Sequence, residues 1–279
     1  MPTKIFSHSV HHANHLPGAH ARLVIETGNT HFACLITDGE SNVSALEWFK
    51  HDRTEQAGFE ELFNNIKESS DILGRDFAHV DVYINNGYSV LIPKELFEEQ
   101  SAETYLDTVT GEAVKSTSLF DHIHVGDDLV NGYRVPTHIL EVLQKKCRYG
   151  TVKHTFSKTL ARLSLLHLPP ESLFVQFYDS EIVVIIFKDG HLQFIQIFTY
   201  ALADDVLYYL LSLVQRLKLN HDQLITKVSG MVDTNATLYQ QLLKYFRNVS
   251  TETVAQERVQ FNLADYPSHY FTPIINLAI

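Results

Sequence analysis

The sequence predicts an α/β protein of two lobes, each built from a mixed β-sheet with flanking helices. Three observations lead to this fold class: a hairpin pattern that occurs twice, an amphipathic helix that follows each copy, and an ordinary globular composition. Apolar residues make up 45% of the chain and charged residues 20%, as in typical folded domains. With 279 residues, the chain is long enough for two lobes whose cores need no disulfide or metal.

The hairpin pattern is carried by residues 23–39 (LVIETGNTHFACLITDG) and 174–190 (FVQFYDSEIVVIIFKDG), which align without a gap. Each copy predicts an apolar strand, a polar break and a second apolar strand that ends at an Asp-Gly pair. We expect tight turns at Asp38-Gly39 and Asp189-Gly190, because this pair is the strongest short hairpin signal. The match indicates an internal duplication.

The elements that follow each hairpin also correspond. A third strand, an amphipathic helix with one apolar side and a further strand are expected in the same order after both copies. Asp204 and Asp205 precede the second helix, where carboxylates cap free N–H groups. The expected third strands cover residues 43–51 and 191–201, the helices 58–73 and 204–219, and the last strands 80–85 and 224–230.

Two tandem βββαβ lobes that each open with a hairpin resemble the actin-like ATPase superfamily, whose lobes have a duplicated ribonuclease H-like fold. The first hairpin, VIETGNTHFACLI, looks like the first phosphate-binding hairpin of that superfamily, with Glu26 in the position of its aspartate. The resemblance implies that Gly28, Asn29 and Thr30 correspond to the turn that contacts phosphate.

The second hairpin departs from the superfamily pattern. VQFYDSEIV lacks the glycines of the second phosphate loop, and Tyr178 and Asp179 stand where the backbone would face phosphate. The adenosine-packing glycine turn is reduced to Gly230 in KVSGMVDTN. The resemblance therefore implies a degenerate nucleotide site in which Asp179, Ser180 and Gly230 are vestigial. No residue corresponds to the superfamily's catalytic acid, so we expect no catalytic residue and no obligatory cofactor, with ATP and Mg²⁺ as the ligands to test.

The order of elements is closest to that of the pilus-assembly scaffold family PilM and its type II secretion relatives. In that family an Ile-Pro segment after an early strand leads into a helical insertion, and this chain has VLIPKELFEEQSAETYLDTVTGEA at residues 90–113. The chain also resembles an uncharacterised bacterial family with the same fold. We expect a polar, His-rich segment over residues 1–19, a first lobe over 20–150 with an insertion over 93–118, and a second lobe over 151–279.

Charge and cysteine content exclude several function classes. Lys and Arg number 22 against 33 Asp and Glu, a net charge of -11 that disfavours binding to nucleic acid or anionic membranes. Cys34 and Cys147 have no paired spacing, which fits a reducing compartment and gives no zinc motif. No apolar run reaches the length of a membrane span, so we expect a cytoplasmic protein.

Histidines suggest two metal sites, neither of which we favour. The N-terminal segment contains His8, His11, His12, His15 and His20, and we expect it to be frayed and solvated. His122 and His124 lie near Asp121, Asp127 and Asp128, where a polar loop edge is the simpler interpretation. The prediction is therefore that the chain holds no metal at either place.

These observations favour a non-catalytic or weakly nucleotide-binding scaffold that acts through protein–protein contacts. The partner is an unidentified protein or a second copy of the chain, and the apolar ending YFTPIINLAI is either core or interface. The alternative is an ATP-dependent small-molecule kinase or ATPase of the same superfamily, since ETGNT also looks like the opening of type III pantothenate kinases. A third class is a metal-dependent hydrolase, for which Glu26 and Asp179 supply only two carboxylates.

Overall fold

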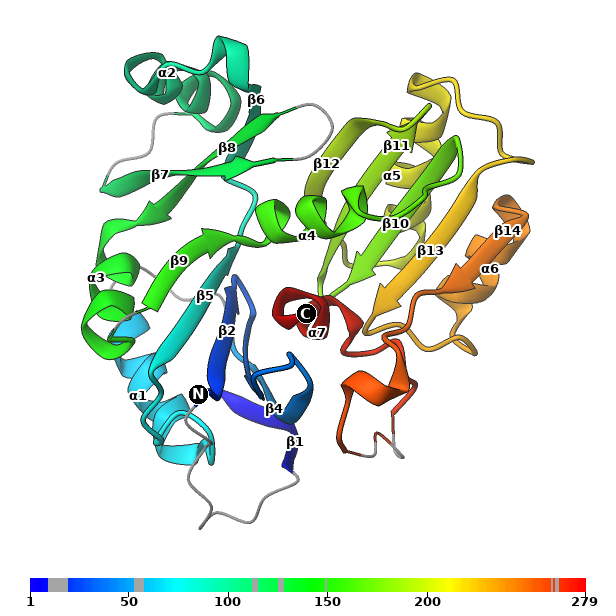
Figure 1. The fold of residues 1–279 in the computed structure, drawn as a ribbon. Coiled ribbons are helices and arrows are strands. Elements are labelled where there is room, and N and C mark those ends of the chain that lie inside the picture. Colours follow the sequence, from blue (N-terminus) through cyan, green and yellow to red (C-terminus); the bar gives the residue numbers. More distant parts are fainter. Residues whose placement is uncertain are drawn as a thin grey trace. The chain divides into compact units, whose positions relative to one another are not determined.

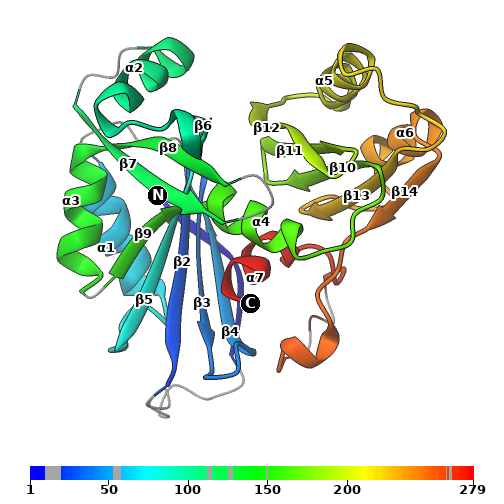
Figure 2. The same cartoon turned by 45° about the horizontal axis from the view of Figure 1, so that its top comes forward.

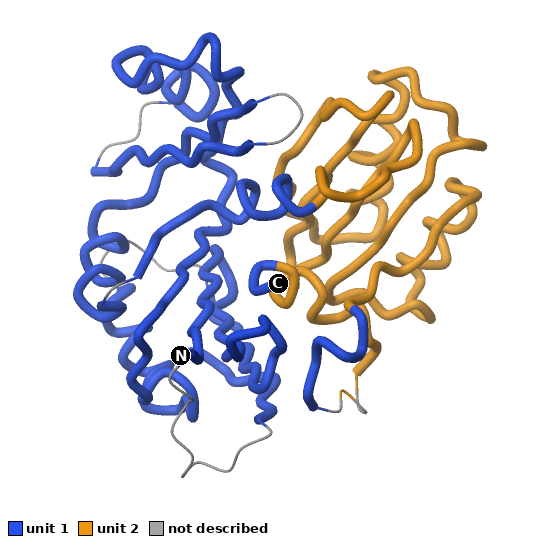
Figure 3. Tube along the Cα trace, in the orientation of Figure 1, with its two compact units in different colours: residues 1–162, 255–262, 277–279 blue, residues 163–254, 263–276 orange. Residues whose placement is uncertain are grey.

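The computed structural model describes residues 1–9, 20–52, 58–111, 115–124, 128–148, 150–261, 263 and 266–279 (Figures 1 and 2). The chain divides into two compact units, which Figure 3 distinguishes by colour. Unit 1 comprises residues 1–162, 255–262 and 277–279, and unit 2 comprises residues 163–254 and 263–276. Each unit is described by itself below.

Unit 1 is built on a mixed sheet of six strands in the order β1-β4-β3-β2-β5-β9. The first four neighbours in this order are antiparallel, whereas β5 and β9 run parallel to β2. The strands are β1 (Thr3–Ser9), β2 (Arg22–Gly28), β3 (His31–Thr37), β4 (Val43–Lys50), β5 (His79–Asn85) and β9 (Gly150–His154).

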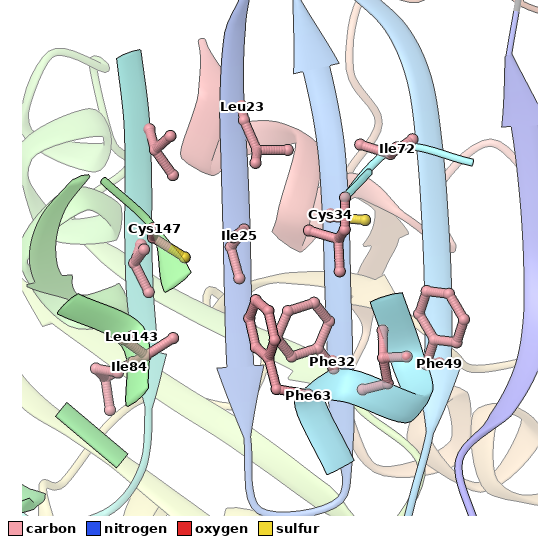
Figure 4. Packing of buried hydrophobic residues seen from close by; sticks show 14 of the residues in the cluster. Leu23, Ile25, Phe32, Cys34, Phe49, Phe63, Ile72, Ile84, Leu143 and Cys147 are labelled. Atoms are coloured by element: carbon pink, nitrogen blue, oxygen red, sulfur yellow. The ribbon is translucent and has the colours of Figure 1, made fainter. Parts of the chain in front are cut away.

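The core of unit 1 lies between this sheet and the helices α1 (Phe59–Ser69) and α3 (Thr137–Lys146). Alternate residues of the strands point to this face, because successive side chains of a strand point to opposite sides of the sheet. Figure 4 shows the result around Ile25, Phe32 and Phe63, with Phe32 and Phe63 edge to face at 5.8 Å. The expected first helix is confirmed, and Cys34 is a fully buried core residue as its sequence context indicated.

The sequence analysis predicted a frayed N-terminal segment, but part of this segment is an ordered strand. Thr3–Ser9 form β1, which pairs with β4. The carboxylate of Glu47 on β4 is 1% exposed and accepts hydrogen bonds from Lys4 Nζ at 2.9 Å and Ser7 Oγ at 3.2 Å. These partners compensate the burial of a charge and attach β1 to the sheet. His11, His12 and His15 lie outside the described residues.

A small antiparallel sheet follows β5 in unit 1, in the order β6-β8-β7. Its elements are β6 (Ser89–Pro93), the 3₁₀ turn η1 (Lys94–Leu96), α2 (Glu99–Thr110), β7 (Ser116–Ile123) and β8 (Leu129–Pro136). Helix α2 lies within the predicted insertion. Arg134 of β8 anchors it by donating to the Asp107 carboxylate at 2.6 Å and to the Gly111 carbonyl at 2.8 Å.

Unit 2 repeats the central topology of unit 1. Its five-stranded sheet has the order β12-β11-β10-β13-β14, with the first three strands antiparallel and the last two parallel to β10. Helices α5 and α6 cover the core face. The elements are β10 (Glu171–Phe177), β11 (Glu181–Lys188), β12 (His191–Thr199), α5 (Ala203–Arg216), β13 (Ile225–Gly230), α6 (Thr237–Tyr245) and β14 (Asn248–Thr251).

The remaining elements are α4 (Thr155–Ser164), the 3₁₀ turn η2 (Gln256–Arg258) and α7 (Thr272–Ala278). Residues 255–261 return to unit 1, where Arg258 donates to the Glu40 carbonyl at 2.7 Å and Phe261 packs on His8 at 4.9 Å. In α7, Ile274, Ile275 and Leu277 are buried, so the apolar C-terminal stretch contributes to the interior of the chain. Throughout the described residues, every helix falls short of the length and apolar character needed to span a membrane.

Candidate functional site

The turn of the first hairpin joins β2 to β3 through Asn29 and Thr30. Glu26 of β2 is fully buried, and its Oε1 accepts a hydrogen bond from Asn85 Nδ2 at 2.8 Å. Gly28, Asn29 and Thr30 are all partly exposed. The residues that the resemblance assigned to phosphate contact are therefore neighbours in the structure, with the carboxylate beneath the turn.

The side chain of His31 occupies the space that Gly28 leaves by lacking a Cβ. A Cβ built on Gly28 would lie 2.2 Å from His31 Cε1. The imidazole is 1% exposed, stacks on Trp48 with ring centroids 4.9 Å apart, and brings Nε2 to 3.5 Å from Glu26 Oε1. In a phosphate loop, glycine allows a ligand to approach the backbone. Here it allows the chain's own histidine to pack against it.

Replacing Gly28 with alanine is expected to lower the free energy of unfolding by about 2 kcal/mol, because the new methyl group displaces a buried ring. In a His31→Ala background the same change should cost less than about 0.5 kcal/mol, a coupling that a double-mutant cycle detects. Urea denaturation followed by the fluorescence of Trp48, the single tryptophan of the chain, measures both values.

Gly87→Ala is the matched control, since a Cβ at Gly87 has no atom within 4 Å. We expect it to change stability by no more than about 0.5 kcal/mol. An unchanged cost of Gly28→Ala in the His31→Ala background would show that the histidine does not fill the site.

The second hairpin turn, in unit 2, is closed by tyrosines. Tyr178 is 3% exposed, and its backbone N–H donates to the Glu181 carbonyl at 2.8 Å. The Tyr200 hydroxyl donates to the carbonyls of Tyr178 at 3.1 Å and Asp179 at 3.2 Å. Burial, and then the nearby Asp179 charge, raise the pKa of Tyr200 to about 12, so its hydroxyl stays protonated as these bonds require. Ser180 is fixed as well, because its carbonyl accepts the Tyr200 N–H at 2.9 Å.

Gly230 lies beside the end of the second hairpin, at the last pair of the parallel β10–β13 ladder. It has a φ of +87°, and a Cβ there would lie 2.0 Å from the Phe177 carbonyl oxygen. Its N–H donates to the His269 carbonyl at 2.8 Å. The structure thus brings Gly230 together with the turn that carries Asp179 and Ser180. Packing of β13 against β10 is sufficient reason for glycine at this position.

The carboxyl ends of the parallel strands β2, β5 and β9 lie at one edge of the unit 1 sheet. Ligands of open α/β sheets bind beyond such ends. Here polar side chains at those ends bond to one another: Asn85 donates to Glu26, and the Thr155 hydroxyl lies 3.5 Å from Asn85 Oδ1. Asn85 is 2% exposed and Thr155 5%. The polar groups of these three side chains are therefore buried and bonded within the chain.

A second set of polar contacts holds the start of α4. His154 is fully buried, and its Nδ1 accepts the backbone N–H of Phe156 at 3.1 Å, as an N-cap does. Its Nε2 lies 3.0 Å from the Asn86 carbonyl, so Nε2 carries the proton. Asp121 accepts the backbone N–H of His154 at 2.8 Å and the Ser157 hydroxyl at 2.7 Å.

These three side chains do not form a nucleophile with a general base. A catalytic serine must hydrogen-bond to the base that takes its proton. Both nitrogens of His154 contact backbone groups, and burial lowers the pKa of its ring to about 3. Burial also raises the pKa of Asp121. The arrangement is suited to stabilising the helix start rather than to proton transfer.

Sequence reasoning did not single out His31, Asn85 or His154. The available signal was the polar residues at the end of each parallel strand, Asn85-Asn86 at the end of β5 and Lys153-His154-Thr155 at the end of β9. Of the histidines that the sequence pattern did indicate, His122 and His124 are exposed, and His124 Nδ1 is 3.5 Å from Asp128 Oδ1. Asp127 lies outside the described residues, among which no group of three or more metal-ligating side chains occurs.

The duplicated βββαβ units define an actin-like ATPase fold, and comparison with solved structures confirms it. A protein of unknown function with an actin-like ATPase fold from Bacteroides thetaiotaomicron matches with a TM-score of 0.72 at 18% identity, over 84% of this chain and 91% of that one. PilM in the PilM–PilN type IV pilus biogenesis complex matches with a TM-score of 0.55 at 12% identity, over 92% and 97%. The cytoplasmic domain of EpsL from Vibrio cholerae matches with a TM-score of 0.49 at 13% identity, over 85% and 92%.

The chain belongs to a family described as "Protein of unknown function (DUF3822)", whose model matches residues 15–249. No curated protein matches the sequence. The resemblance to the actin-like superfamily and to PilM is thus confirmed at the level of fold, and the family to which the chain belongs is an uncharacterised one, as expected.

Proposed function

We propose that this chain is a non-catalytic actin-like scaffold that acts through protein–protein contacts. The observation that carries the proposal is that the chain's own side chains fill the space at its first hairpin turn. The His31 ring packs where a Cβ of Gly28 would lie. A phosphate would have to displace a buried ring that stacks on Trp48.

The second hairpin supports the same proposal. A phosphate loop presents free backbone N–H groups to its ligand. In this turn the Tyr178 N–H is bonded within the hairpin, and the Tyr200 hydroxyl bridges the two carbonyls beside it. Asp179 adds a negative charge that repels a triphosphate. Binding and hydrolysis of ATP would therefore require both turns to rearrange.

A scaffold role also agrees with one of the structural neighbours. PilM was solved in a complex with PilN, so a chain of this fold can bind another protein. We extend that mode of action to this chain as part of the proposal. The net charge of -11 favours a partner with basic or uncharged contact surfaces over a nucleic acid.

Calorimetric titration with ATP and ADP, with and without Mg²⁺, tests the proposal. We expect no heat of binding from the folded protein, which places any dissociation constant above about 1 mM, or -4.1 kcal/mol. We also expect no release of phosphate from ATP. The Asn29→Asp variant adds charge to the first turn at nearly constant volume and should behave like the wild type.

Binding tighter than about 100 μM, or roughly -5.5 kcal/mol, that Asn29→Asp weakens would overturn the proposal. It would favour the ATP-dependent kinase or ATPase alternative, with the nucleotide at the first hairpin.

A further inference from the structure

Strand β12 forms one edge of the unit 2 sheet. It pairs with β11 on one side, and no other described strand pairs with it on the opposite side (Figures 1 and 2). None of its nine residues is buried, whereas β11 is buried at every position except Lys188. An edge strand presents unpaired backbone N–H and C=O groups, which is a template for another strand.

The other edges of the two large sheets have features that discourage such pairing. Strand β1 carries Lys4, β9 carries Lys153, and β14 is only four residues long. Charged residues and short length protect natural sheet edges. Residues 191–199, HLQFIQIFT, contain no Lys, Arg, Asp, Glu or Pro. Among the described edges of these two sheets, β12 is the long and uncharged one.

The backbone groups that face outward from β12 follow from its pairing with β11. The Tyr200 N–H donates to the Ser180 carbonyl at 2.9 Å, so residue 200 faces β11. Residues alternate between the two sides of an antiparallel strand, which places Ile195, Ile197 and Thr199 on the outer side. The Thr199 carbonyl accepts the Tyr209 hydroxyl at 3.2 Å instead of a β11 donor, as this assignment requires. The register irregularity lies at Gln193, before this segment.

Two of the outward-facing residues, Ile195 and Ile197, lie within a palindrome, FIQIF at residues 194–198. If two copies of this strand pair antiparallel around Gln196, Ile195 of one copy faces Ile197 of the other. Each such pair exchanges both of its N–H···O bonds. Phe194 then faces Phe198 of the other copy, and Gln196 faces Gln196. Aromatic and β-branched cross-strand pairs of this kind stabilise sheets.

We infer that β12 is a homodimerisation strand, which pairs antiparallel with β12 of a second copy across a two-fold axis at Gln196. The occupant is a second copy because the segment is uncharged in a chain with a net charge of -11. Two such chains repel one another over most of their surfaces, and an uncharged edge is where they can approach. A two-fold axis also limits the contact to a closed dimer.

Disulfide trapping tests the register directly. Residues that face each other in a non-hydrogen-bonded antiparallel pair have Cα atoms about 4.5 Å apart, within the range of a disulfide. Gln196→Cys should therefore form a covalent dimer rapidly under mild oxidation. Gln193→Cys is the control, because its two copies would lie about 20 Å apart at 3.4 Å per residue. The native Cys34 and Cys147 are 0% and 8% exposed, so they do not compete.

The oligomeric state provides an independent measurement. Light scattering should give the dimer mass for the wild type at a protein concentration of about 100 μM. This concentration lies above the dissociation constant of a dimer that forms with roughly micromolar affinity. Gln196→Lys should give the monomer mass, because it places two like charges face to face. A monomeric wild type, or equal cross-linking of the Gln196→Cys and Gln193→Cys variants, would overturn the inference. The result does not depend on the nucleotide titration, since β12 can pair with a second copy whether or not the chain binds ATP.

Discussion

Replacing Gly230 with alanine is expected to lower the free energy of unfolding by about 3 kcal/mol or more. The backbone at Gly230 has a φ of +87°, which disfavours any residue with a Cβ. The added Cβ would also lie 2.0 Å from Phe177 O and 2.8 Å from Phe177 N. Phe177 cannot retreat easily, because it is 1% exposed and its carbonyl accepts the Met231 N–H at 2.8 Å. Denaturant unfolding followed by circular dichroism measures the loss.

Gly190→Ala separates the cost of the left-handed backbone conformation from the cost of the steric clash with Phe177. Gly190 has a φ of +80°, and a Cβ there has no atom within 4 Å. This variant should lose only about 1 to 2 kcal/mol, the cost of the left-handed conformation alone. If Gly230→Ala unfolds at the same denaturant concentration as Gly190→Ala, the close approach of β13 to β10 is not what requires glycine. Failure of Gly230→Ala to fold, with Gly190→Ala folded, agrees with the prediction.

The repeat was predictable because its signals are local. Asp189 and Gly190 have φ values of 53° and 80°, so they form the two-residue turn that the Asp-Gly pair predicts. A tight turn also forms at Asp38-Gly39, where the Ser41 N–H donates to the Asp38 carbonyl at 3.1 Å, but it is part of a longer loop than the turn at Asp189-Gly190. There β3 and β4 are joined by residues 38–42, with Ser41 at a φ of 64° and the Asp38 carboxylate bonded to the Asn42 N–H at 2.9 Å. An Asx-type side-chain contact closed a longer loop instead.

The candidate site was predictable only in part, because it depends on contacts between distant segments. The pattern around Glu26 and Gly28 located the first hairpin turn. It could not show that the His31 side chain packs over Gly28, since a local sequence pattern does not determine the rotamer of a side chain. Asn85 reaches Glu26 across 59 residues of sequence, and Lys4 reaches Glu47 across 43. The polar N-terminal sequence by itself does not predict β1, because this strand depends on pairing with the distant strand β4.

Lowering the pH from 7 to 4 is expected to destabilise the wild type by about 3 kcal/mol more than a His154→Asn variant. Burial lowers the pKa of His154 to about 3 in the folded protein, whereas its ordinary value is 6.5. Between these two values the unfolded chain binds a proton that the folded chain does not. Stability therefore falls as the pH falls through this window, by about 1.4 kcal/mol per unit, and the effect is complete below pH 3.

The structural reason is that both ring nitrogens of His154 are already committed. Protonation would place a hydrogen on Nδ1, which accepts the Phe156 N–H at 3.1 Å, and would bury a charge. Asparagine is the informative replacement because it is a preferred N-cap and can still accept that N–H. Other buried histidines, such as His51 with its lowered pKa, titrate alike in both proteins and cancel in the comparison.

Protonation of Asp121 changes the free energy of unfolding in the opposite direction, and its contribution can be measured separately from that of His154. Burial raises the pKa of Asp121 in the folded protein, so its protonation as the pH falls favours the folded state. In an Asp121→Asn variant the loss of stability between pH 6 and pH 4 should therefore be steeper than in the wild type. Urea denaturation of the three proteins at each half unit of pH measures the slopes. Equal slopes for wild type and His154→Asn would mean that the ring accepts a proton in the folded state, and that the carboxyl end of β9 is open to water.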